Sequence, residues 1–117
     1  MNNIIERTFN FSVRIVKLCQ FLSKEYSPDK NVLLRQLLRS GTSIGANVEE
    51  AQSGQSRADF VSKMSIALKE ARETNYWLRL MKATEVVTEE QISNLLEESE
   101  ELKKILASII ISSKRNT

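Results

Sequence analysis

The side chains of this chain that could do chemistry are cations and short polar groups. Four cations recur through residues 7–24 at helical spacing. At 100° per residue they fall within about 100° of one another, and Asn10 and Phe21 lie inside the same arc. Such a row could contact phosphates and stack an aromatic ring on a base. The predicted nucleic-acid contacts are Arg7, Arg14, Lys17 and Lys24, with Arg35 and Arg39 as secondary candidates.

The alternative for this row is a solvated helix face. Phe21 would then be half tucked into the protein or into a neighbouring subunit. Because four cations on one copy bind weakly, the nucleic-acid hypothesis gains from an oligomer, in which avidity multiplies the patch.

Residues 34–51 combine an apolar helix face with a polar line. The apolar face has 3-4-3-4 spacing and consists of Leu34, Leu37, Gly41, Ile44, Val48 and Ala51. A second glycine, Gly45, also lies in the middle of this helix. Each glycine inside a helix costs about 1 kcal/mol relative to alanine, so we expect close helix packing to offset this cost. The polar line either fixes the register between helices or subunits, which we favour, or lines a ligand site. It consists of Gln36, Ser40, Ser43, Asn47 and Glu50.

Several kinds of catalytic and metal site are excluded by composition. The chain has no histidine and one cysteine, Cys19, which lies on an apolar helix face and is predicted to be buried. Di-iron sites with Glu-x-x-His pairs, zinc sites and Ser–His or Cys–His nucleophiles therefore cannot form. Glutamates such as Glu70 and Glu73 could gather as carboxylates, but salt bridges or solvent account for them more simply. We predict no metal, no cofactor and no catalytic residue.

Length and composition indicate one all-helical domain over residues 1–117. The chain is 41% hydrophobic, with three glycines and one proline. No segment approaches the roughly 18 apolar residues of a membrane span, and the N-terminus lacks the layout of a signal peptide. We therefore expect a cytoplasmic protein with no membrane partner.

The charge is unevenly distributed. Residues 85–101 contain seven acidic and no basic residues, whereas residues 1–84 contain 13 basic and 8 acidic ones. Such asymmetry indicates either a basic binding face or neighbouring helices that neutralise one another.

Apolar periodicity predicts an antiparallel, up-down-up-down four-helix bundle with short connections. For the fourth helix, the predicted core line includes Ile92, Leu95, Leu102, either Ile105 or Leu106, and Ile109. Residues after Ser112 are expected to fray. The predicted helices cover about residues 3–25, 28–53, 57–83 and 89–113.

The connections carry helix start and stop signals. Ser27 and Ser56 are suited to cap the second and third helices, and Gly54 to break the chain between them. Thr88 and Gln91 form a capping-box pattern at the start of the fourth helix.

Two apolar features exceed what one core can bury. Trp77, with Tyr76, makes the third helix apolar over more than one face, and the run 109–111 is three consecutive isoleucines. Subunit contact explains both, although a bulky core aromatic also explains Trp77.

The segments Gln36–Ala51, Ser56–Phe60 and Ala67–Leu78 resemble the bacterial four-helix-bundle proteins encoded in intervening sequences of 23S ribosomal RNA genes, the S23 ribosomal protein family. The resemblance covers nearly the whole chain and is strongest over residues 36–81. It implies a four-helix bundle and a homopentameric ring. The biochemical role of the family is poorly defined, so the resemblance implies no particular activity.

We expect from these observations a non-enzymatic homo-oligomer, a pentamer by the resemblance, that binds RNA or DNA through a basic surface. The alternative is an oligomeric scaffold that docks a partner protein and binds no nucleic acid.

Overall fold

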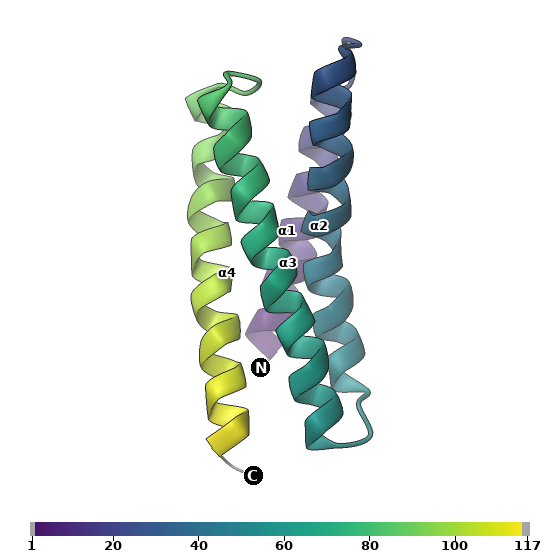
Figure 1. Cartoon of the computed structure of the whole chain (residues 1–117), viewed down its shortest axis with the longest axis vertical. Coiled ribbons are helices and arrows are strands. Elements are labelled where there is room, and N and C mark those ends of the chain that lie inside the picture. Colours follow the sequence, from purple (N-terminus) through teal and green to yellow (C-terminus); the bar gives the residue numbers. More distant parts are fainter. Residues whose placement is uncertain (1, 116–117) are drawn as a thin grey trace.

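The computed structural model describes residues 2–115 and shows four long helices that run alternately up and down (Figure 1). The predicted all-α antiparallel bundle is confirmed. Both ends of the described chain lie at one end of the bundle, and the α1–α2 and α3–α4 turns lie at the other. The helices are α1 (Asn2–Leu22), α2 (Pro28–Gln52), α3 (Arg57–Ala83) and α4 (Glu89–Arg115).

The helices form a four-sided bundle. α2 packs against α1 and α3, and α3 packs against α4, whereas α1 and α4 meet over the least extensive seam. Within the described chain, the backbone of α1 does not approach that of α3, and the backbone of α2 does not approach that of α4, so these two pairs are diagonal. The principal extents are 49 × 21 × 20 Å, which is the shape expected for helices of about 40 Å placed side by side.

The predicted apolar lines form the core on α2 and α3. All six apolar positions predicted on α2 are buried. On α3 the 4-3-4-3 spacing predicts a core line in which Phe60 is half-buried and the other members are buried, namely Met64, Ala67, Ala71, Thr74, Leu78 and Met81. The α4 line needs a correction near its end, because Ile110 is buried and Ile109 is only half-buried. A helix of 3.6 residues per turn drifts by about 20° per heptad, which carries Ile110 onto the core face by the third heptad.

The first helix ends at Leu22, so the predicted end at Glu25 is wrong. After the last α-helical bond the chain tightens, since Lys24 N donates to Phe21 O at 3.4 Å. Proline then restricts the residue before it to extended backbone, and Ser27 has φ −154° and ψ 122°. The Ser27 hydroxyl makes no cap bond and instead donates to Asp29 Oδ1 at 2.8 Å, lowering the pKa of that carboxyl.

The break after α2 differs from a left-handed glycine cap. The helix ends at Gln52, and Ser53 N and Gly54 N donate to Glu50 O and Ala51 O, both at 3.1 Å. Among residues 2–115 no glycine has positive φ. Glycine is favoured at position 54 because there is little room for a side chain, and not because of its φ angle. An added Cβ would lie 3.2 Å from Ala51 O.

The other two predicted caps are confirmed. The Ser56 hydroxyl accepts from Asp59 N at 3.1 Å. Thr88 and Gln91 bond reciprocally, with Gln91 N donating to Thr88 Oγ1 at 3.2 Å and Thr88 N to Gln91 Oε1 at 2.9 Å.

The C-terminal helix is longer than predicted. The predicted fraying after Ser112 is wrong for residues 113–115, because α4 continues to Arg115. Residues 116–117 lie outside the described range. Cations in the last turn interact favourably with the helix dipole, which supports the added turn. Over the described range, no helix has a stretch hydrophobic and long enough to traverse a lipid bilayer.

Candidate nucleic-acid interface

The first member of the predicted α1 row, Arg7, is held in an ion pair. Its Nε donates to Glu98 Oε2 at 3.0 Å and its Nη2 to Glu98 Oε1 at 2.6 Å. This two-pronged bond across the α1–α4 seam raises the pKa of Arg7, and the Glu98 carboxylate compensates the positive charge of the guanidinium. Arg7 therefore joins α4 to α1, and a phosphate would have to compete with Glu98 for it.

The other cations of the α1 row point to solvent. Arg14, Lys17 and Lys24 are exposed, and no acidic side chain in residues 2–115 pairs with them. Lys24 Nζ lies 5.3 Å from the centre of the Phe21 ring, which is 54% exposed. The nucleic-acid role of this row stays a prediction.

Arg39, a secondary candidate, is also held by acids. It forms ion pairs with Glu70, at 3.2 Å, and with Glu73. Trp77 Nε1 donates to the same Glu73 carboxylate at 3.0 Å, so the N–H group of this half-buried indole has a hydrogen-bond partner. The glutamates considered above as gathered carboxylates thus bind an arginine of α2, in the manner of a structural salt bridge.

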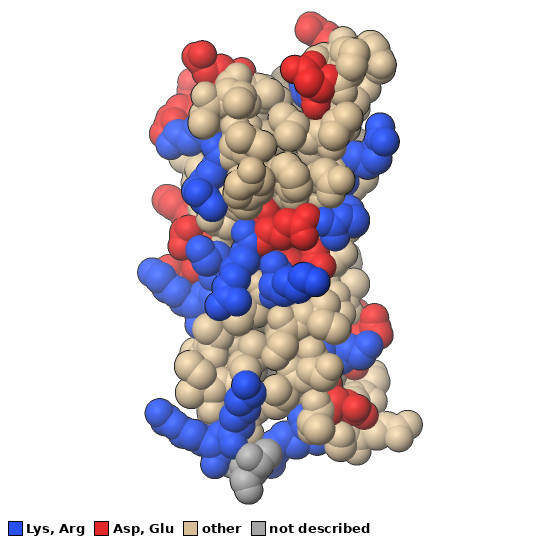
Figure 2. All heavy atoms as spheres, in the orientation of Figure 1, with Lys and Arg blue, Asp and Glu red and all other residues tan. Residues whose placement is uncertain are grey.

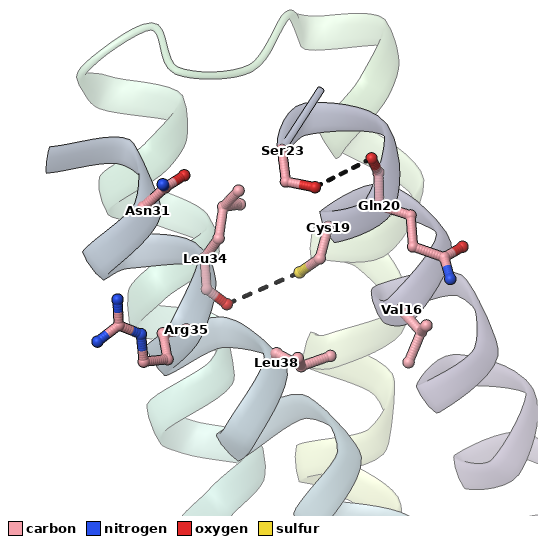
Figure 3. Close-up of a pocket in the computed structure, with 8 residues that line it drawn as sticks. All are labelled: Val16, Cys19, Gln20, Ser23, Asn31, Leu34, Arg35 and Leu38. Carbon is pink, nitrogen blue, oxygen red and sulfur yellow. Dashed lines mark hydrogen bonds between the residues drawn. The ribbon is translucent and has the colours of Figure 1, made fainter. Parts of the chain in front are cut away.

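Arg35 lies at the edge of a hollow of about 430 Å³ between α1 and α2 (Figure 3). Apolar side chains such as Val16, Leu34 and Leu38 line the hollow together with the polar side chains of Gln20, Ser23 and Asn31. Cys19 is buried at this seam, as predicted, and its Sγ donates to Leu34 O at 3.7 Å. Burial raises the pKa of the Cys19 thiol to about 11, so the thiolate that would react is suppressed at neutral pH.

The polar line of α2 is not a uniform feature. Ser40 is fully buried, and a hydrogen bond of 2.9 Å joins its hydroxyl to that of Thr74 on α3. Ser43 and Asn47 bond backbone carbonyls of their own helix. Gln36 accepts from Arg39 Nε at 3.4 Å, and exposed Glu50 pairs with Lys63 of α3 at 3.3 Å.

Gly41 and Gly45 lie where α2 crosses α1. A Cβ on Gly45 would lie 3.1 Å from the backbone oxygen of Thr8, and one on Gly41 would lie 3.0 Å from Ile15 Cγ1. Both distances are shorter than ordinary van der Waals contact, so the absence of a Cβ permits this approach.

A buried polar contact between α3 and α4 was not predicted. Asn75 Nδ2 donates to Ser99 Oγ and to Glu100 Oε2, both at 2.9 Å. A signal for it was present in the sequence, because the predicted α4 core line skips a full heptad between Leu95 and Leu102, and Ser99 fills that gap. No buried side-chain polar atom of the described residues lacks a partner.

A second row of cations on α3 was also missed. Lys69 and Arg72 are exposed and have no acidic partner within residues 2–115. Tyr76 is 48% exposed, and the guanidinium carbon of Arg79 lies 5.8 Å from its ring centre. Basic side chains gather beside acidic ones in the middle of the face shown in Figure 2. We call Lys69, Arg72, Tyr76 and Arg79 the α3 row.

The α3 row was hidden in the sequence by interleaved acids. Glu70 and Glu73 make residues 69–73 look electrically neutral. In the structure these acids bond Arg39 on the α2 side, and no other acid of residues 2–115 neutralises Lys69 or Arg72. The spacing of the row matches one face of a helix, as for the α1 row.

These features define an antiparallel four-helix bundle with cations arranged in rows on its surface. The sequence matches the 23S rRNA-intervening sequence protein family over residues 1–108, and the chain belongs to this family, which confirms the resemblance. It is similar to a crystal structure from Bacteroides thetaiotaomicron VPI-5482, a protein of unknown function from the S23 ribosomal protein family. The two chains are 50% identical with a TM-score of 0.83, over 92% of this chain and 97% of the other. A search of curated proteins found no match.

Proposed function

We propose that this protein is a non-enzymatic homo-oligomer that binds RNA or DNA through the α3 row. The observation that carries the proposal is that Lys69 and Arg72, which have no acidic partner in residues 2–115, share a helix face with the exposed ring of Tyr76. The guanidinium carbon of Arg79 lies 5.8 Å from the centre of that ring. Cations placed along a helix neutralise phosphates and release their counterions, and an exposed ring offers a face to a base.

Avidity makes an oligomer part of the proposal. One copy contributes only three cations from this row, and so few phosphate contacts bind weakly. Several copies in one assembly would present several rows to the same strand and raise the affinity without any new kind of contact. The homopentamer implied by the resemblance is the form we propose.

The second candidate function is a scaffold that docks a partner protein. Phe9 favours it, because this large apolar side chain is 57% exposed on α1, outside the core. Apolar surface of this kind marks protein contact rather than phosphate contact.

Charge reversal on the α3 row tests the proposal. Binding of a labelled single-stranded RNA and of a duplex DNA would be followed by fluorescence anisotropy across a salt series. We expect Lys69→Glu with Arg72→Glu to weaken binding at least about tenfold, and to lower the salt slope by roughly 0.7–0.9 for each phosphate that the variant no longer neutralises.

A matched control keeps the change in net charge the same. Arg57→Glu with Arg115→Glu reverses two exposed cations at the ends of α3 and α4, and should leave affinity within about twofold. Equal weakening by both double variants would contradict the α3 row as the site. If the unmodified protein binds neither nucleic acid at low salt, the scaffold replaces this proposal.

A further inference from the structure

We infer that the groove between α1 and α2 is a subunit contact, and that it receives the outer face of α4 from a second copy of this chain. The inference rests on the homo-oligomer of the proposed function and names the surfaces that build it. Its first support is a second apolar seam on α1. Phe9, Val13 and Val16 follow at i, i+4 and i+7, outside the core face that holds Phe11 and Ile15. A helix with two apolar seams has two partners, of which the bundle supplies one.

The outer seam lines a long groove. Three hollows of about 390, 410 and 430 Å³ follow one another along α1. The first and second share Phe9, and the second and third share Val16 and Gln20, so the hollows adjoin one another along α1. The second is lined by α1 alone, and the other two are lined by α1 and α2 together. Leu38 of α2, 39% exposed, lines the third hollow. A groove of this shape is suited to a helix laid along it.

The charges along the groove are graded. Glu6 and Glu49 line the hollow nearest the N-terminus. Lys17 and Arg35 line the hollows nearer the α1–α2 turn. None of these four side chains has an ion-pair partner within residues 2–115.

The outer face of α4 carries the opposite gradient. Glu90 and Glu97 are exposed toward the α3–α4 turn, and neither is paired within the part of the chain that the structure describes. Lys104 and Ile111, which is 55% exposed, line a hollow toward the C-terminal end. Among the described residues, Lys104 is held only by Glu101 of its own helix, at 3.8 Å.

The two gradients match when copies stand side by side with parallel axes. Both turns lie at the same end of the bundle, so acids of α4 meet cations of the groove there (Figure 1). At the other end, Lys104 meets Glu6 and Glu49 of the neighbour. Complementary charge of this kind fixes register and suppresses wrong partners.

The contact joins two different surfaces. α4 lies diagonal to α2, so the groove and the outer face of α4 lie on different sides of one copy. Such a head-to-tail contact repeats and closes as a ring when its rotation allows. No residue of α3 lines the three hollows along α1 or the hollow on α4, so the α3 row lies outside the proposed contact.

Charge swapping across the contact tests the inference, with mass measured by light scattering after size exclusion. We expect Lys17→Glu alone and Glu97→Lys alone each to raise the dissociation constant about tenfold or more, and the double variant to restore the mass. Phe9→Asp should also dissociate the assembly while helix content by circular dichroism stays unchanged. Arg57→Glu is the charge-matched control and should keep the mass of the unmodified protein.

The outcomes separate this inference from the proposed function. An unmodified protein with the mass of one copy overturns the oligomer and this contact together, and leaves the groove to a partner protein. An assembly whose mass survives all three single variants overturns this contact alone. Restoration of the mass by the charge-swapped pair supports it.

Discussion

The two sides of α2 join their neighbours by different chemistry. Toward α1, Gly41 and Gly45 let the helices approach, and the contacts are side-chain carbon and backbone. Toward α3, the Ser40–Thr74 hydrogen bond and the ion pair of Arg39 with Glu70 join the helices. Close approach gives the first seam its stability, whereas directional bonds give the second its register.

The outer surfaces of α1 and α3 also differ in chemistry, since one is apolar and the other is cationic. On the outer side of α1 lies a hollow lined by apolar side chains such as Phe9 and Val13. On α3, the acids beside the cation row bond Arg39, and no acid of residues 2–115 pairs with Lys69 or Arg72. The comparison shows apolar surface on α1 and cations without an acidic partner on α3, and we propose that the first serves contacts between copies and the second an anionic polymer.

The largest expected effect comes from filling the close α1–α2 approach. Gly45→Leu should lower the free energy of unfolding by about 2–3 kcal/mol, because the side chain must displace backbone of α1. Urea unfolding followed by circular dichroism measures it. Ala46→Leu, one residue along and exposed, is the control and should change stability by less than about 0.5 kcal/mol. Equal stability of the two variants would show that the seam is not tightly packed.

A smaller effect is expected at the polar seam. Thr74→Val should cost about 1–2 kcal/mol, because it leaves the buried Ser40 hydroxyl without its partner on α3. Adding Ser40→Ala should recover part of that loss, since both hydroxyls are then removed. A double-mutant cycle in urea measures the coupling, and strictly additive losses would argue against a register bond here.

The smallest effect is the pH dependence carried by Cys19 in the α1–α2 seam. Its pKa is raised from 9.0 to about 11 by burial, so the folded state holds the thiol proton more tightly than the unfolded state. The stability from this group is complete below about pH 9 and is lost as pH rises toward about 11. Urea midpoints measured between these limits should fall more for the unmodified protein than for Cys19→Ala. Parallel curves would place the thiol in contact with water.

Much of the bundle was predictable because its signals are local. The 3-4 spacing on α2 identified every buried apolar position of that helix. Thr88 and Gln91 formed the reciprocal cap that their spacing indicates. Such features depend on residues within one or two turns, where sequence separation and spatial separation agree.

The surface was harder to predict, because it depends on how each helix is turned toward its neighbours. Arg7 and Arg39 belong to regular cation spacings, yet both are neutralised by acids distant in sequence, Glu98 and Glu70. The α3 row was masked by acids adjacent in sequence that bond a different helix. Sequence spacing locates charges on a helix but does not reveal which of them find a partner in the fold.

The most direct test of the separate surfaces is one light-scattering experiment on the unmodified protein with and without RNA at low salt. Without RNA we predict a mass of several chains of 13.4 kDa each. With RNA we predict that this mass increases by the mass of the bound RNA. A protein of 13.4 kDa at every concentration, or an assembly that RNA takes apart, would contradict the account.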